Sequence, residues 1–170
     1  MEGLSSGVPE PLIPQPVIAD RARVLVPALR HLPERVLRAM VIGLEAEIDN
    51  LAAGRLFARH GGGGCAVGVT LQVLFPAKFK PGTVRYLRRW RMKRVDADRD
   101  LAIRFPRLRH IEFAFDSTVR MTKAHRPGLD DREATRAVGL WFSAEAQAEL
   151  DRRRRDRHPA QQRALSLARA

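Results

Sequence analysis

Basic side chains that could contact phosphate groups concentrate in one stretch of this chain. Residues 78–109 hold twelve Lys or Arg and three acidic residues, so they carry +9 of the total net charge of +12. At the centre of this stretch, Tyr86 and Trp90 are interleaved with cations in residues 85–94. A field of one sign attracts polyanions, and aromatic rings beside guanidinium groups suit bases and phosphates. The pattern therefore favours binding of nucleic acid.

Residues 83–94 are expected to form an amphipathic helix that presents these cations. At 100° per residue, four of the cations share an arc of about 140°, and the aromatic and aliphatic side chains occupy much of the opposite side. The phosphate contacts predicted in and before this helix are Lys78, Lys80, Arg85, Arg88, Arg89, Arg91, Lys93 and Arg94. In the alternative interpretation, Tyr86 and Trp90 are core residues and the arginines form a solvated face. A helix-turn-helix that begins with residues 65–75 would have an unusually long turn, so backbone-directed binding is the preferred version.

A second basic run lies near the C-terminus, where residues 152–157 contain five arginines and one aspartate. It continues the last predicted helix and could lie along phosphates or contact an acidic protein. The contacts predicted in this run are Arg152, Arg153, Arg154, Arg155 and Arg157. The residues beside it lack large apolar side chains, so no membrane anchoring is expected.

His60 and Cys65 are the residue types of a thiol-based catalytic site, and four glycines separate them. The glycines could form an anion-binding concavity, and a helix that starts directly afterwards would lower the pKa of the Cys65 thiol. His60 could then act as the base. The alternative is a flexible hinge followed by a buried, inert cysteine. The segment has neither the Lys-Ser/Thr of a phosphate-binding loop nor the glycine spacing of a dinucleotide site, and no cofactor is expected.

Metal binding is not predicted. The five histidines share no ligand spacing, and a single cysteine cannot complete a structural zinc site. Glu112, Asp116 and Arg120 fall on one helical face, where an ion-pair ladder is favoured over a metal or acid–base pair. Three aspartates at 96, 98 and 100 lack the glycine and terminal glutamate of a calcium loop.

The composition limits the class of protein to which this chain can belong. One cysteine excludes an intramolecular disulfide and fits a reducing compartment. No secretory signal and no apolar run of 18 residues is visible, so we expect a cytoplasmic protein. Residues 1–60 have no net charge, and residues 61–170 carry the entire +12. Codon bias explains 27 arginines against 4 lysines, but it does not explain why acidic residues fail to balance them.

Hydrophobic periodicity predicts an all-α protein, a compact bundle of about five helices. We expect a disordered, proline-rich arm over residues 1–19, a single helical domain over 20–158 and a frayed tail over 159–170. Within the domain, helices are predicted near residues 20–30, 33–51, 65–75, 83–94, 106–123 and from 130 onwards. Apolar residues alternate within 108–121, so a strand remains an alternative to a helix for these residues.

These features predict a protein that binds nucleic acid without catalysing a reaction. DNA is favoured because the chain lacks the aromatic sheet motifs of RNA-binding domains. The alternatives are an adaptor for an acidic protein partner, or an enzyme that uses Cys65 and His60 on an anionic substrate. The sequence does not fix the oligomeric state.

Overall fold

The computed structural model describes residues 11–56, 63–76 and 105–167, with side chains up to residue 157. In this part of the chain, every element of regular secondary structure is a helix, which confirms the predicted all-α fold. The elements are α1 (Gln15–Arg30), α2 (Glu34–Ala46), the 3-10 helix η1 (Ile48–Asn50), α3 (Ala66–Leu74), α6 (Pro106–His125) and α7 (Asp131–Leu167). A single bridge joins Leu51 to Gly64.

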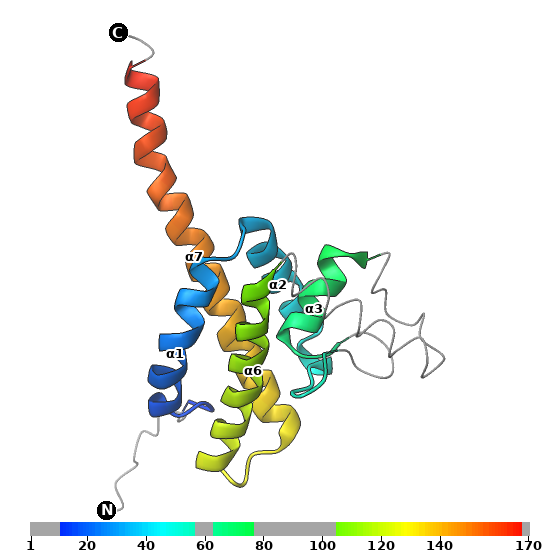
Figure 1. Ribbon diagram of the computed structural model, residues 1–170. Coiled ribbons are helices and arrows are strands. Elements are labelled where there is room, and N and C mark those ends of the chain that lie inside the picture. Colours follow the sequence, from blue (N-terminus) through cyan, green and yellow to red (C-terminus); the bar gives the residue numbers. More distant parts are fainter. Residues whose placement is uncertain (1–10, 57–62, 77–104, 168–170) are drawn as a thin grey trace, which may run out of the picture.

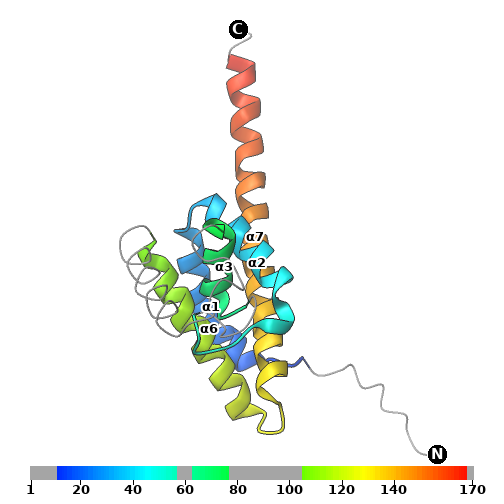
Figure 2. The same ribbon diagram turned by 90° about the vertical axis from the view of Figure 1, so that its right-hand side faces the viewer.

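The helices surround one hydrophobic core (Figure 1). α2 packs between α3 and α7, α1 packs against α6, and α6 also contacts α7. Phe115 of α6 and Phe142 of α7 meet edge to face near the middle of the bundle, with ring centroids 5.2 Å apart. The first half of α7 lies in the bundle, whereas its second half extends well beyond it (Figures 1 and 2).

Both ends of the predicted domain differ from the expectation. α1 begins at Gln15, so residues 15–19 are helical and the predicted arm over 1–19 is wrong for them. Pro16 stands in the first turn, where a missing N–H costs nothing, and Val17 is buried in the core. α7 continues to Leu167, so the tail predicted to fray at 159 is helical to that point, because a long helix propagates through residues such as Ala, Gln, Arg and Leu.

The remaining helix predictions hold within a few residues. The helix expected over 33–51 divides into α2 and η1, and Pro33 is its N-cap. The structure resolves 106–125 as helix rather than strand. Asp130 caps α7, because the Glu133 amide donates to its Oδ1 at 2.7 Å. The predicted helix 83–94 and residues 1–10 lie outside the described residues.

Glycines allow α3 to approach its neighbours closely. A Cβ on Gly68 would lie 1.5 Å from the carbonyl oxygen of Leu56, and one on Gly43 would lie 2.7 Å from that of Val69. Both obstacles are backbone atoms, which cannot rotate away as a side chain can. Because Gly43 and Gly68 have no side chains, α3 can pack directly against α2 and the 51–56 segment.

We predict that Gly68→Ala lowers the free energy of unfolding by about 2–4 kcal/mol. Alanine favours a helix by about 1 kcal/mol over glycine, but the clash with the Leu56 backbone outweighs this gain. Urea unfolding would measure the difference. The matched control is Gly128→Ala, where nothing lies within 4 Å of the new Cβ and the change should stay within about 0.5 kcal/mol. Equal effects of the two substitutions would contradict this packing.

Candidate functional site

Glu149 is a buried carboxylate at the point where α7 leaves the bundle, with 7% of its surface exposed. Arg152 donates to both of its oxygens at 2.8 Å, and Nε of Arg153 donates to Oε1 at 2.7 Å. The guanidinium of Arg152, and then that of Arg153, lower the pKa of Glu149 to about 2 against the opposing effect of burial. This carboxylate is therefore ionised at neutral pH and fixes two arginines of the predicted basic run.

Arg153 connects α7 to the turn between α1 and α2. Its Nη1 donates to the carbonyl of Leu32 at 2.9 Å, and its Nη2 donates to those of Arg30 at 2.9 Å and Leu29 at 3.3 Å. The last carbonyls of a helix have no partner within the helix, so these bonds complete the C-terminus of α1. Arg153 is thus part of the scaffold and not a free phosphate contact.

Three other arginines of the run also have partners within the chain. Arg152 additionally bonds Asp156 at 2.6 Å, Arg154 pairs with Asp151 at 3.4 Å, and Arg157 pairs with Glu34 of α2. Surface pairs of this kind contribute only about 0–1 kcal/mol, so a phosphate can replace the carboxylate at little cost. Arg155 is exposed and its side chain has no hydrogen bond or ion pair to a described residue.

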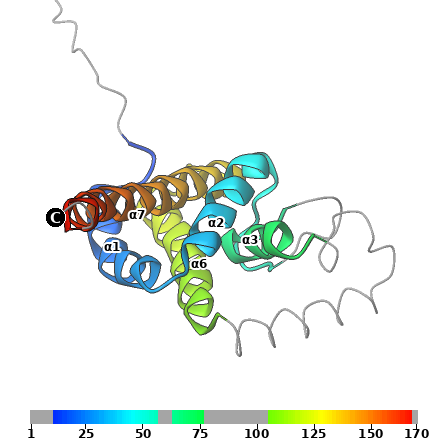
Figure 3. The same cartoon turned by 90° about the horizontal axis from the view of Figure 1, so that it is seen from above.

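The described residues that flank the basic segment 77–104 lie at the same end of the bundle. The ring of Phe105, just before α6, lies 6.4 Å from that of Phe75, just after α3. The guanidinium of Arg35, in the first turn of α2, lies 5.6 Å from the centre of the Phe105 ring. The predicted contacts from Lys78 to Arg94 lie outside the described residues, but the positions that flank them are anchored here. Figure 3 looks onto this end, with α7 projecting towards the viewer.

We call residues 29–38, 105–110 and 149–157 the arginine-rich end. It contains ten arginines and four carboxylates. Residues 47–56 and 116–136, at the other end of the helices, contain six cations and six carboxylates. The described part of the fold therefore concentrates positive charge at one end.

Three exposed arginines of the arginine-rich end have side chains without a hydrogen bond or ion pair to any described residue. They are Arg30, Arg107 and Arg155. Of these three, only Arg155 was predicted as a contact from the sequence. Arg30 stands alone in its helical stretch, and Arg107 lies in the basic stretch 78–109 but outside the predicted helix 83–94. Only the fold brings the two to the same end as the run in α7.

Cys65 does not have the environment of a nucleophile. It is buried, and burial together with the nearby Glu112 carboxylate raises the pKa of its thiol to about 12. The lowered pKa of the catalytic alternative is wrong, because desolvation outweighs the opposing effect of the amides that start α3. The alternative of a buried, inert cysteine is the one that the structure supports. His60 lies outside the described residues.

The described glycines before Cys65 form a packed turn. The carbonyl of Gly64 accepts from the Ala52 amide at 2.9 Å, and the Cys65 amide donates to the carbonyl of Arg55 at 2.7 Å. Gly63 has a φ of 107°, and a Cβ there would lie 2.3 Å from the carbonyl oxygen of Asn50. These contacts fix the turn against the 50–55 segment and occupy the Cys65 amide that an anion would need.

The Glu112–Asp116–Arg120 face also has a structural use. Asp116 accepts a hydrogen bond from the amide of Gly54 at 2.8 Å, which joins α6 to the turn after η1. Among the described residues, no group of three or more His, Cys, Asp or Glu side chains could hold a metal ion. None of the described helices is both long and apolar enough to cross a membrane.

We predict that Glu149→Gln lowers the free energy of unfolding at pH 7 by about 3 kcal/mol. The folded-state pKa lies below the unfolded value, so this contribution is present above about pH 4.5 and is lost as the pH falls towards 2. Urea unfolding at pH 7, 4.5 and 3 should show the two proteins converging in acid. Asp156→Asn, which removes an exposed partner of Arg152, is the control and should change stability by less than about 1 kcal/mol. A constant difference across the pH range would contradict this assignment.

We also predict that the Cys65 thiol reacts with a small disulfide reagent at pH 7.5 at least about 100-fold more slowly in the folded protein than in urea. A buried thiol with a raised pKa is rarely ionised and rarely reached. Absorbance of the released thiolate measures both rates. A folded-state rate as fast as that of the unfolded chain would restore the thiol enzyme as a candidate.

Comparison with known proteins gives no relative from which to transfer a function. No family model, no curated protein and no solved structure matches this chain. The arginine-rich end is therefore judged on its own geometry and charge.

Proposed function

We propose that this protein binds nucleic acid, with duplex DNA preferred, through the arginine-rich end. The observation that carries the proposal is that residues 152–157 and the two residues that flank segment 77–104 lie at one end of the bundle. Residues 152–157 lie beside the α1–α2 turn, and the Phe75–Phe105 contact places the flanks of the basic segment 77–104 at the same end. Charges that are far apart in the sequence could thus act on one polyanion.

The exposed arginines of this end suit contacts to the phosphate backbone. Arg30, Arg107 and Arg155 lose no described ion pair when a phosphate binds them. Arg154 and Arg157 exchange one weak surface pair for another, which is close to neutral in energy. Contacts of this kind position a protein on the duplex and give affinity with little sequence preference.

The extension of α7 supports a duplex as the partner. Its helical backbone continues to Leu167, beyond the pairing of Arg157 with Glu34, and Figure 2 shows it standing clear of the other helices. The major groove of duplex DNA has the width to admit one α-helix. A free helix next to a cluster of phosphate contacts is consistent with that geometry.

The test compares two double substitutions that remove the same charge. Arg107→Gln with Arg155→Gln acts on the arginine-rich end, and Arg120→Gln with Arg132→Gln acts on exposed arginines at the other end. Mobility shift of a random-sequence duplex without terminal phosphates, from about 50 to 200 mM salt, should show about tenfold weaker binding at 50 mM for the first variant. Its slope of log affinity against log salt should fall by about 2, because each phosphate contact contributes about 0.9.

The second variant is the control and should change affinity less than about threefold. No binding of the unsubstituted protein at 50 mM salt would overturn the proposal, as would equal weakening by both variants. Arg88→Glu with Arg89→Glu tests the segment 77–104 in the same assay, and unchanged binding would remove that segment from the interface. Co-purification of an acidic protein that survives nuclease and dissociates in salt would instead support the adaptor.

A further inference from the structure

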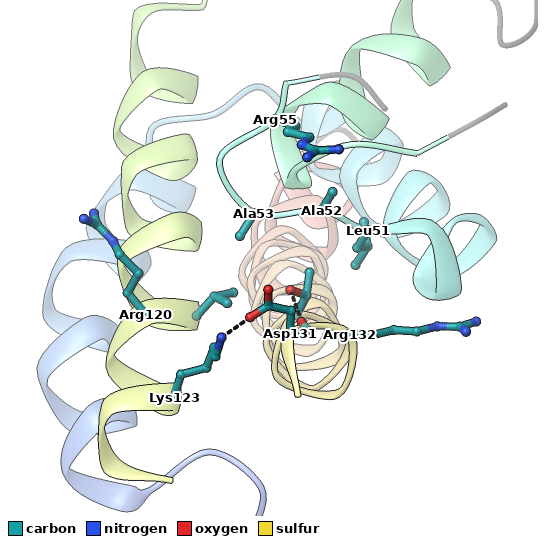
Figure 4. Close-up of a pocket in the computed structure, with 10 residues that line it drawn as sticks. Leu51, Ala52, Ala53, Arg55, Arg120, Lys123, Asp131 and Arg132 are labelled. Atoms are coloured by element: carbon teal, nitrogen blue, oxygen red, sulfur yellow. Dashed lines mark hydrogen bonds and ion pairs between the residues drawn. The ribbon is translucent and has the colours of Figure 1, made fainter. Parts of the chain in front are cut away.

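A pocket of about 380 Å³ lies at the other end of the bundle, away from the arginine-rich end. It is bounded by the 51–55 segment, the C-terminal half of α6 and the first turns of α7 (Figure 4). This volume is within the range of pockets that hold small molecules. Nothing in the proposed binding of nucleic acid uses it.

The lining of the pocket is strongly cationic. Four basic side chains contribute to it, Arg55, Arg120, Lys123 and Arg132, together with the single carboxylate of Asp131. Lys123 and Asp131 form an ion pair across the pocket, which Figure 4 shows at its centre. The other three side chains are exposed and have no hydrogen bond or ion pair to any residue that the structure describes.

These three guanidinium groups are free to move onto a ligand. In Figure 4 those of Arg120 and Arg132 extend outwards on either side of the Lys123–Asp131 pair. Because neither has a described partner, rotation towards the pocket breaks no bond. Guanidinium forks match the oxygen geometry of phosphate, and Asp131 is the one group there that opposes an anion.

Apart from Thr135, the rest of the lining is apolar. Ala52, Ala53 and Val119 contribute to it, and Leu51 is buried beneath it. An inorganic ion alone would leave this surface unused. A ligand with an anionic head and a compact apolar body would use both parts.

We propose that this pocket binds a small phosphate monoester. Its phosphate takes over Lys123 from Asp131 and is enclosed by the three free guanidinium groups, and its organic part contacts the alanines and Val119. The phosphate could belong to a free metabolite-sized ester or to the terminal phosphate of a nucleic acid strand. Both sources present the same dianionic group.

The probes for the test are phenyl phosphate and inorganic phosphate, titrated calorimetrically at constant ionic strength in chloride. Phenyl phosphate should bind saturably with one site per chain and at least about fivefold more tightly than inorganic phosphate, because only it contacts the apolar lining. Arg120→Gln with Arg132→Gln should weaken its binding at least tenfold. Arg107→Gln with Arg155→Gln, which removes the same charge from the arginine-rich end, should change it less than twofold.

The source of the phosphate is tested by competition. A 5′-phosphorylated oligonucleotide that displaces phenyl phosphate, when the unphosphorylated one does not, identifies a strand end. Displacement by neither leaves the free ester as the ligand. Absence of saturable binding up to about 10 mM phenyl phosphate, or equal weakening by the two double substitutions, overturns the proposal. Because the two double variants act at opposite ends, this result is independent of the mobility-shift test.

Discussion

The hydrogen bonds of Arg153 to the end of α1 are the constraint on which the arginine-rich end depends. α1 turns into α2 through Pro33, and the carbonyls left at this turn need donors from elsewhere. Arg153 supplies three such bonds, and Glu149 beside it supplies the countercharge that a partly buried guanidinium requires. Together with the packing of α7 against α2 and α6, the Glu149–Arg153 pair holds the basic run beside the α1–α2 turn.

The contacts of Glu149 also give the arginines of residues 152–157 different roles. Glu149 holds Arg152 and Arg153 rigidly, whereas Arg154 and Arg157 make single surface pairs and Arg155 makes none to a described residue. The run of five arginines thus contains two that are part of the scaffold and others whose surface ion pairs can be exchanged for contacts to a phosphate. The free extension of α7 begins directly after the scaffold, so its base is held while the rest stands clear of the bundle (Figure 1).

Which segments form helices could be predicted from the sequence, because helix formation depends on local periodicity and capping. Pro106, Asp130 and Glu133 are local signals for the starts of α6 and α7, and the structure uses all three. The role of Arg153 could not be predicted, because its partners lie more than 120 residues away. The pocket escaped prediction for the same reason, since three separate segments build it. The sequence left two alternatives for Cys65, and the structure supports the buried, inert thiol, because burial is a property of packing and not of the glycines before it.

The unequal distribution of charge remains the strongest argument that the arginine-rich end has a partner. Codon bias would replace lysine by arginine everywhere, and the other end of the helices shows that this chain can balance its cations with an equal number of carboxylates. At the arginine-rich end, three of the positive charges in the excess of six are not needed by the fold, because the side chains of Arg30, Arg107 and Arg155 have no hydrogen bond or ion pair to a described residue. Like charges held together repel one another and reduce stability. A destabilising cluster of like charges is retained where a bound anion reduces the repulsion. A phosphate backbone is an extended anion that fits several exposed arginines at once.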